Sequence, residues 1–445
     1  MNIINTIIIG GGHAGVNLAC MLEIDEPSLD YLILERDENL LVKWRKFRWE
    51  NFNLNTPIKY SLLYGQKDER DEWLLERSIE GELERWDAHI ANLGIRHKLH
   101  SNVKNIEKDG EKDIFIVTVE ETDPTSGTKS IVKYHSMNVV VCNGYYDTPT
   151  APAKIADAIP AAYGIKQHIA AANFQFDDLV DGNALLVGSG QTGIQVADLL
   201  LRRRPEVKLY LCTSYVKGCP RGFDGKDLFY WLEEMGFLTM PRSAIEAIRE
   251  KDPKRYEALR YPKAPVQGPT ADVSPFSLHR QGVELLGHLD SVTCNNEGEG
   301  GDGITFLFKD DRAKNLQFCY NGFVGFSNSI KKCAGASLDS PDPQEWSNIE
   351  PELLEESGRL SINAAEENIT NIIYCTGWSH DFSFLNGIKG IGGDLDEKIN
   401  APDVITSRVT EGLFYCGFPT IGTLQSLNIT KFNLDAKAIV DGLRR

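Results

Sequence analysis

The sequence predicts an α/β protein that contains the same small unit twice, and two observations carry this prediction. Residues 7–9 are a short β-branched run that leads into a glycine-rich turn at residues 10–15, after which apolar residues recur at helical spacing. Residues 184–187 lead in the same way into a second glycine-rich turn at residues 188–193. A strand, a glycine turn and a helix in this order are typical of a dinucleotide-binding unit of the Rossmann type.

The remaining elements are predicted from hydrophobic patterning. Each unit continues into a second strand, at residues 31–34 in the first copy and 209–211 in the second. Further expected elements are a helix at 78–93, strands within 113–142 that end in a strand buried on both faces at 139–142, a surface loop at 290–303, an irregular region at 336–366, a strand at 371–374 and a closing helix at 434–443.

Length, composition and charge exclude several classes of protein. The 445 residues are enough for two or three domains, and 42% hydrophobic with 25% charged residues is ordinary for a globular protein. The formal net charge of −17 argues against nucleic acid or an anionic membrane as the main partner. No apolar run approaches the roughly 20 residues that span a bilayer. We therefore expect a cytoplasmic protein with no membrane partner.

The nine cysteines are scattered, and no pair has CxxC spacing. This predicts reduced thiols in a reducing compartment, and it argues against the reductases that work through such a dithiol pair. His97 and His100 form an HxxH pair without further ligands nearby, so no metal site is predicted.

The glycines of each turn have separate physical roles. The first permits a tight turn, the second lets the backbone approach a pyrophosphate, and the third lets the helix pack closely on the strand. The N-terminus of the helix then faces the phosphates. The glycines predicted to bind a cofactor are Gly10, Gly12 and Gly15 in the first unit and Gly188, Gly190 and Gly193 in the second.

The residue after the second strand indicates which nucleotide each unit binds. In the first unit this is Glu35, whose carboxylate suits the ribose 2′-hydroxyl of FAD or NAD and repels the 2′-phosphate of NADPH. The second unit has Thr213 and Ser214 there, followed by Lys217 and Arg221. FAD is therefore predicted in the first unit and NADPH in the second. The alternative is that Lys217 and Arg221 are solvated surface charges.

Further motifs extend the pattern over nearly the whole chain. They are residues 35–37 leading to Trp44, residues 52–57, the two similar segments 142–144 and 375–378, and the stretches 221–231 and 278–287. In these motifs the chain resembles the class B flavin-dependent monooxygenases (flavin-containing and Baeyer–Villiger-like), and most of all their short bacterial flavoproteins labelled as accessory to cation efflux. The resemblance implies that Arg36, Trp44, Thr376 and Gly377 also bind cofactor.

The resemblance implies a nested α/β architecture of two Rossmann-like dinucleotide-binding domains. Segments 142–144 and 375–378 are similar to the family's two linkers between domains, and inserting one domain into another requires two crossings. We expect an FAD-binding domain of residues 1–155 and 370–445, with an NADPH-binding domain of residues 156–369 inserted into it.

The resemblance implies the function of an NADPH- and FAD-dependent monooxygenase. It would insert one oxygen atom from O2 into a small molecule through a flavin C4a-peroxide, by N- or S-oxygenation or by Baeyer–Villiger oxidation. Asn55 and Thr56, in the segment near the flavin, and His168 are the candidate catalytic residues. The alternatives are turn residues ahead of Pro57 for the first two, and a structural histidine for the third.

The chain departs from the family pattern in two places, of which the first concerns contacts to the flavin ring and the second favours a reductase. Residues 41–43 replace a glycine pair, and Ala162 and Ala172 stand where the family has aromatic residues around Gly164 and His168. A flavoprotein reductase or dehydrogenase without oxygen insertion is therefore the main alternative, and a non-catalytic FAD-binding sensor is the second. Assembly into a homo-oligomer stays open.

Overall fold

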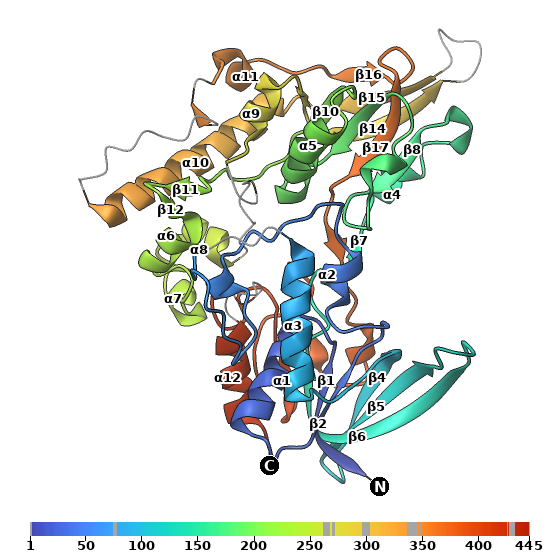
Figure 1. Ribbon diagram of the computed structural model, residues 1–445, viewed down its shortest axis with the longest axis vertical. Helices are drawn as coiled ribbons and strands as arrows, with labels where there is room; N and C mark the ends of the chain where they lie inside the picture. Colours follow the sequence, from blue (N-terminus) through green and yellow to red (C-terminus); the bar gives the residue numbers. More distant parts are fainter. Residues whose placement is uncertain are drawn as a thin grey trace.

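The computed structural model describes residues 2–73, 78–260, 268, 272–295, 303–335, 346–347, 349–424, 426 and 432–444. Two α/β lobes lie one above the other along the long axis of the molecule (Figure 1). We call the lobe with the first glycine turn the first lobe and the lobe with the second glycine turn the second lobe. Both chain ends lie at the first lobe's far end (Figure 1).

The first lobe is built on a sheet in the order β3-β2-β1-β6-β5-β4, with β21 also paired to β6. The central strand β1 runs parallel to β2 and to the second half of β6, whereas the first half of β6 pairs antiparallel with β5. The strands are β1 (Ile3–Ile9), β2 (Tyr31–Leu34), β3 (His97–Lys98), β4 (Ser101–Asp109), β5 (Ile114–Thr122), β6 (Lys129–Val141) and β21 (Leu413–Tyr415).

Both faces of this sheet are covered. Ile8 of β1 packs in the cluster formed with helices α1 (His13–Asp25), α3 (Ile79–Leu93) and α12 (Phe432–Gly442). Ile7 and Ile9 point to the opposite face, where Phe382, Leu385 and Phe418 are among the residues that cover them. Because successive side chains of a strand point to opposite faces, a strand covered on both sides is apolar throughout, as residues 7–9 are.

The second lobe is built on a fully parallel sheet in the order β13-β10-β9-β17-β8. Helices pack on one face, and the small antiparallel sheet β14-β15-β16 packs on the other. The strands are β8 (Lys166–Ile169), β9 (Asn183–Val187), β10 (Leu209–Cys212), β13 (Glu284–Leu286), β14 (Leu289–Asn295), β15 (Gly303–Phe308), β16 (Ser361–Asn363) and β17 (Ile369–Tyr374), and the helices are α4 (Ala153–Ala156), α5 (Gln191–Arg203), α9 (Pro275–Arg280), α10 (Arg312–Ala334) and α11 (Pro351–Glu355).

The boundary between the lobes lies after strand β17, and therefore later than residue 370, where it was expected from the sequence. β17 pairs with β8 and β9, so residues 370–374 belong to the second sheet, and the chain returns to the first lobe only afterwards. The two crossings lie side by side, because β7 (Thr148–Pro149) pairs antiparallel with β18 (Trp378–Ser379). β21 and α12 then pack on β6 and α1 of the first lobe.

Two regions expected to lack regular structure contain some. The stretch 290–303 was expected as a loop, but β14 covers its first residues and β15 begins at its last, while residues 296–302 lie outside the described residues. Within 336–366, expected as irregular, α11 and β16 form, and residues 336–345 are not among those described. β16 completes a sheet with β15, a pairing over long range that local composition does not encode.

Residues 228–260 form an arm of three short helices, α6 (Leu228–Glu234), α7 (Arg242–Glu246) and α8 (Pro253–Arg260). The arm extends from the second lobe along the side of the first, toward α12 (Figure 1). There Pro241 forms a β-bridge with Thr423, and the Leu424 N–H donates to the Met240 carbonyl at 2.9 Å. None of the helices in the described part of the chain is long and apolar enough to cross a lipid bilayer.

Candidate functional site: two glycine turns and the contact between the lobes

The two glycine turns have matching geometry. Gly10 and Gly188 have φ of +102° and +107°, a region that favours glycine, and a side chain on either would meet a backbone carbonyl, that of Cys142 or Cys375. A Cβ on Gly15 or Gly193 would overlap the carbonyl oxygen of Gly10 or Gly188. The first and third glycines therefore allow the turn and the close packing of helix on strand.

The second glycine of each turn faces open space. A Cβ on Gly12 or Gly190 would have no protein atom within 4 Å. Both residues are the N-caps of their helices, α1 and α5, and neither helix has a side-chain cap. The backbone N–H groups at both helix starts can thus donate to an anionic group, and the open space is where a pyrophosphate would fit.

Glu35 lies beside the first glycine turn and contacts its backbone. Its Oε2 accepts from the Gly11 N–H at 2.6 Å and its Oε1 from the Asp37 N–H at 2.9 Å. Burial raises the pKa of this carboxyl, and the two N–H groups partly oppose that rise. Glu35 lines a cavity of about 410 Å³ together with Gly10 and Gly12, so the expected ribose-binding acid and phosphate-binding turn share one hollow.

Arg36 lines the same cavity and is held by Asp147, which directly precedes β7. The Arg36 Nη2 lies 2.5 Å from Asp147 Oδ1, and the Lys43 Nζ lies 3.5 Å from the same oxygen. Asp147 was not identified from the sequence, because it follows the linker motif without belonging to it. It fixes two cations on one wall of the cavity.

Trp44 lies in α2 (Val42–Lys46), within an aromatic cluster beside this cavity. Its ring centroid is 6.0 Å from that of Trp86 and 6.2 Å from that of Phe52, and the Arg48 guanidinium lies 4.4 Å from the Trp44 ring. Trp44 is not among the residues that line the 410 Å³ cavity. Its contact with a cofactor stays a prediction.

Several buried polar atoms of the first lobe have no hydrogen-bond partner among the described residues. They belong to His13, Trp49, Thr56, Asn143 and Asp435, and they include donors as well as acceptors. Such atoms are rare in folded proteins and call for a ligand or water as partner. FAD offers phosphate oxygens, ribityl hydroxyls and ring nitrogens of both kinds, so the chemistry of these groups fits it.

Asn55 lies where the two lobes meet. Its backbone carbonyl accepts from Arg221 Nη1 at 2.7 Å, and its side-chain oxygen accepts from Gln195 Nε2 of α5 at 3.1 Å. The side-chain oxygen is thus engaged by the second lobe. The neighbouring Thr56 hydroxyl is buried and has no partner among the described residues. Of these two neighbouring residues, both predicted to be catalytic, Thr56 keeps a hydroxyl that a ligand could use.

His168 lies in β8 beside Ile373, inside the second lobe. It is buried, its ring centroid is 5.2 Å from that of Phe174, and burial is the main cause that lowers its pKa. A neutral histidine packed against a ring fits the structural interpretation better than the catalytic one. Ala172, where the resemblance expects an aromatic, is exposed, and buried Phe174 supplies the ring instead.

Thr376 and Gly377 hold the two linkers together. The Thr376 hydroxyl donates to the Thr150 carbonyl at 2.5 Å, and the Thr150 N–H donates to the Gly377 carbonyl at 3.1 Å. Gly377 has φ of +94°. These contacts give both residues a role in the crossing, and their contact with a cofactor stays a prediction.

The four residues expected around the NADPH ribose divide into two pairs. Thr213 is buried and donates to the Leu286 carbonyl at 2.7 Å, and Arg221 is buried in an ion pair of 2.7 Å with Asp227. These partners count against their contact with a 2′-phosphate. Ser214 is different, because its N–H donates to the Ser189 hydroxyl of the second glycine turn at 2.8 Å. Lys217 is half-buried nearby in the chain.

Comparison with known proteins gives distant relatives. No family model matches the chain. An uncharacterized oxidoreductase CzcO from Bacillus velezensis is 25% identical over 243 residues, which are 54% of this chain and 64% of that protein. Its namesake from Bacillus subtilis is 24% identical over 243 residues. The match therefore spans less than two thirds of the length of either relative.

Solved structures match over nearly the whole chain. A flavin-containing monooxygenase from Stenotrophomonas maltophilia has a TM-score of 0.58 at 13% identity and covers 99% of this chain and 98% of its own. An ornithine N-hydroxylase from Kutzneria, solved with reduced FAD and NADP⁺, has a TM-score of 0.60 at 12% identity, and the match covers 99% of each chain. A bacillithiol disulfide reductase from Bacillus cereus reaches 0.57 at 14%, covering 99% of each chain.

The chain thus has a class B flavin monooxygenase-like fold, a mixed α/β architecture whose structural relatives bind FAD and NADP. This confirms the resemblance at the level of the fold. Its distant sequence relatives carry the name oxidoreductase, and disulfide reductases share the fold with the monooxygenases.

Proposed function

We propose that this protein is an FAD- and NADPH-dependent monooxygenase that inserts one oxygen atom from O2 into a small molecule, at nitrogen, at sulfur or beside a ketone. The observation that carries the proposal is the pair of open, uncapped glycine turns, one in each lobe, with the Asn55 segment held between the lobes. Bound FAD would accept hydride from NADPH and react with O2.

The chain's own residues supply binding, orientation and shielding. Glu35 and the turn at Gly12 would hold the FAD ribose and pyrophosphate. Gln195 and Arg221 hold the Asn55 segment against the second lobe, which fixes the two nucleotide sites relative to each other. Thr56 would donate or accept one hydrogen bond at the flavin from a site that excludes bulk water.

A single rapid-mixing experiment tests oxygen insertion. The purified protein is reduced with NADPH without air and then mixed with O2, while the flavin spectrum and the release of H2O2 are followed. For a monooxygenase we expect a spectrum that is neither reduced nor oxidised flavin, lasting seconds or longer with NADP⁺ present. With a substrate, H2O2 should fall well below the NADPH consumed. Direct reoxidation in one phase, with one H2O2 per NADPH for every amine, thioether and ketone tried, would exclude the proposal.

A reductase that passes electrons to a small acceptor is the second candidate, and the fold shared with bacillithiol disulfide reductases supports it. Against a thiol-based mechanism, burial raises the pKa of Cys375, beside the second turn, to about 12. A thiol with so high a pKa is a poor nucleophile at neutral pH. The mixing experiment separates the two functions, because a reductase would show rapid NADPH oxidation by its acceptor and no oxygenated flavin spectrum.

NADPH is expected to reduce the flavin faster than NADH, with Lys217 as the main source of the preference. A lysine paired with a phosphate is a charge-assisted contact, so Lys217→Ala should reduce the NADPH/NADH ratio of kcat/KM by about 10-fold. Arg221→Met should lower the stability of the protein and slow flavin reduction by NADPH and by NADH alike, because Arg221 pairs with Asp227 and with the Asn55 carbonyl. The measurement is anaerobic flavin reduction at varied nucleotide concentration.

Lys226→Ala is the matched control, since Lys226 is an exposed lysine on the nearby strand β12 (Lys226–Asp227), and it should leave the ratio unchanged. Equal reduction rates with NADPH and NADH in the unmodified protein would contradict the assignment. So would a ratio that responds to Arg221→Met and not to Lys217→Ala.

A further inference from the structure

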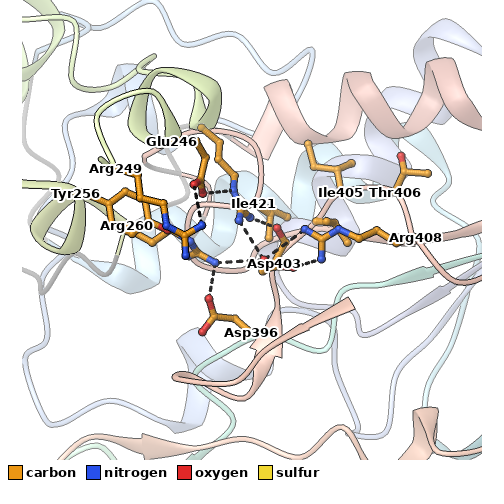
Figure 2. A pocket seen from close by; sticks show the side chains of 12 residues that line it. Glu246, Arg249, Tyr256, Arg260, Asp396, Asp403, Ile405, Thr406, Arg408 and Ile421 are labelled. Atoms are coloured by element: carbon orange, nitrogen blue, oxygen red, sulfur yellow. Dashed lines mark hydrogen bonds and ion pairs between the residues drawn. The ribbon is translucent and has the colours of Figure 1, made fainter. Parts of the chain in front are cut away.

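A second hollow, of about 680 Å³, lies between the helical arm and the first lobe. The arm supplies Arg242 of α7, Arg249 between α7 and α8, and Arg260 of α8. The first-lobe segment after β20 (Ala401–Pro402) supplies Asp403 and Arg408. In Figure 2, Arg249 and Arg408 approach the hollow from opposite sides, with Asp403 between them. None of the predicted cofactor residues lines it.

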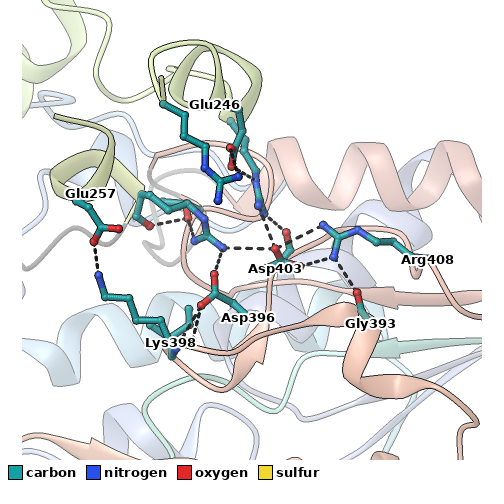
Figure 3. A network of polar contacts seen from close by, with 12 residues as sticks. Glu246, Glu257, Gly393, Asp396, Lys398, Asp403 and Arg408 are labelled. Atoms are coloured by element: carbon teal, nitrogen blue, oxygen red, sulfur yellow. Dashed lines mark hydrogen bonds and ion pairs between the residues drawn. The ribbon is translucent and has the colours of Figure 1, made fainter. Parts of the chain in front are cut away.

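Three of these arginines share one carboxylate. Asp403 lies 2.7 Å from Arg408, 3.0 Å from Arg242 and 3.6 Å from Arg260, measured between guanidinium nitrogens and carboxylate oxygens (Figure 3). Burial works against ionisation of Asp403, but hydrogen bonds from Arg408 and Arg242 lower its pKa below the ordinary value. Asp403 is therefore an anion at neutral pH, and three cations converge on it.

The buried arginine of the group is part of the scaffold. Arg260 is 1% exposed, lies 2.8 Å from Asp396, and donates to the Thr420 hydroxyl at 2.5 Å. Arg242 is held by Asp403 and by Glu246 at 3.2 Å. These contacts fix the arm on the first lobe and form the base of the hollow.

Two arginines at the rim have side chains that are partly exposed to solvent. The Arg249 side chain is 67% exposed, and its nearest carboxylate, Glu246, is 3.9 Å away. The Arg408 side chain is 49% exposed, and its guanidinium donates to Asp403 and to the Gly393 carbonyl at 2.9 Å. Among the described residues, four guanidinium groups line the hollow against the three carboxylates of Glu246, Asp396 and Asp403, in a chain whose net charge is −17. A local excess of cations in an acidic protein indicates an anionic ligand.

Apolar and aromatic residues complete the lining. Tyr256 comes from the arm, and Val404, Ile405 and Ile421 come from the first lobe. An inorganic anion would make no use of these groups, whereas an organic anion would bury its carbon skeleton against them. The planar fork of a guanidinium also matches a carboxylate in two parallel hydrogen bonds.

We propose that this hollow binds a small organic acid, whose carboxylate groups are held by Arg249 and Arg408 and whose apolar part lies against Tyr256 and Ile405. The site is separate from both glycine turns, and it does not depend on the proposed oxygenase activity.

The test is a calorimetric titration of the full-length, flavin-loaded protein with phthalate, a compact aromatic dicarboxylate, without NADPH. We expect saturable binding of one phthalate per chain that weakens as NaCl is added, because exposed charges are screened. Arg249→Ala and Arg408→Ala should each weaken binding by about 10-fold, the order expected for one charge-assisted contact. Arg255→Ala, an exposed arginine of α8 outside the hollow, should bind like the unmodified protein.

Three outcomes would overturn the proposal. They are no saturable phthalate binding, phthalate binding that is unchanged by Arg249→Ala, and inorganic phosphate that binds as tightly as phthalate. In the described part of the chain, Arg249 has one ion pair, the 3.9 Å contact with Glu246, and its side chain is 67% exposed. Such an exposed pair contributes little to stability, so removing Arg249 should not disturb the fold, and a thermal melt of Arg249→Ala that matches the unmodified protein verifies this. Flavin reduction by NADPH is measured in the same samples, so failure of this site and failure of the proposed oxygenase are distinguishable.

Discussion

Gly12→Val is expected to give a folded but colourless protein, and Gly190→Val a yellow protein that NADPH no longer reduces. Neither residue needs a glycine conformation, because φ is −72° at Gly12 and −65° at Gly190 with extended ψ. A Cβ at either position has no protein atom within 4 Å, so a valine side chain would extend into the space proposed for a pyrophosphate. The backbone could then no longer approach the pyrophosphate, and the binding affinity for FAD or NADPH should fall by at least about 100-fold, or roughly 3 kcal/mol.

The measurements are the ratio of flavin to protein absorbance after purification, titration of stripped protein with FAD, and anaerobic reduction by NADPH. Gly15→Val is the control for a change that harms the fold, since its side chain would overlap the Gly10 carbonyl and should reduce the yield of folded protein. A Gly12→Val protein that purifies with a full complement of FAD would show that the first turn does not hold the flavin.

The glycine turns could be predicted because their information is local. The order of strand, glycines and helix within residues 7–20 is a short-range pattern, and the structure gives Gly10 and Gly188 the same unusual backbone conformation. The equivalence of Glu35 and Thr213 also holds in position, since each directly follows the second strand of its unit. The equivalence does not carry over to the side chains, because the Thr213 hydroxyl turns to Leu286 in the neighbouring strand.

The misassigned features depend on contacts over long range. Residues 371–374 read as a buried strand, but the sequence does not say which of two parallel sheets receives it. Arg221 looked like an available cation, and its burial against Asp227 and the distant Asn55 carbonyl appears only in the fold. Charged residues are mostly exposed unless they are paired, and the spacing of Arg221 and Asp227 in the sequence does not show that they pair.

Residues missed from the sequence share a trait. No motif specifies the residue type at Asp147, Gln195, His13 or Asp435: the first three stand inside or just after a motif, and Asp435 stands in the closing helix. His13 stands inside the first glycine turn, and its ring packs 4.9 Å from that of Trp86 while both nitrogens lack partners among the described residues. A buried histidine among apolar residues marks a candidate ligand contact, but the sequence does not show that His13 is buried.

Asp435 is expected to make the protein less stable as pH rises from about 4 to about 7, and Asp435→Asn should remove this dependence. Asp435 lies in the first turn of α12 and is 1% exposed. Its Oδ1 accepts from the Ser426 hydroxyl at 3.1 Å, and its Oδ2 has no partner within the described part of the chain. Burial raises its pKa from 3.8 to about 7.

The sign of the effect follows from proton linkage. Between the ordinary pKa and the raised one, the folded protein binds a proton that the unfolded chain has released, so each increase in pH favours unfolding. The stability that the protonated carboxyl contributes is fully present below about pH 4 and is lost by about pH 7, when the folded carboxyl ionises. The raised pKa corresponds to a change of at most about 4 kcal/mol in the free energy of unfolding.

Asparagine keeps the shape of the protonated carboxyl and cannot ionise. Asp435→Asn should therefore match the unmodified protein near pH 4.5 and be more stable at pH 8 by about 2 to 4 kcal/mol. Urea unfolding at both pH values measures this difference. Asp441→Asn is the matched control on the same helix, because Asp441 is exposed and only pairs with Lys437. An Asp435→Asn protein that is less stable than the unmodified one at pH 8 would mean that the buried carboxylate is ionised and held by a partner, such as a group of the bound flavin.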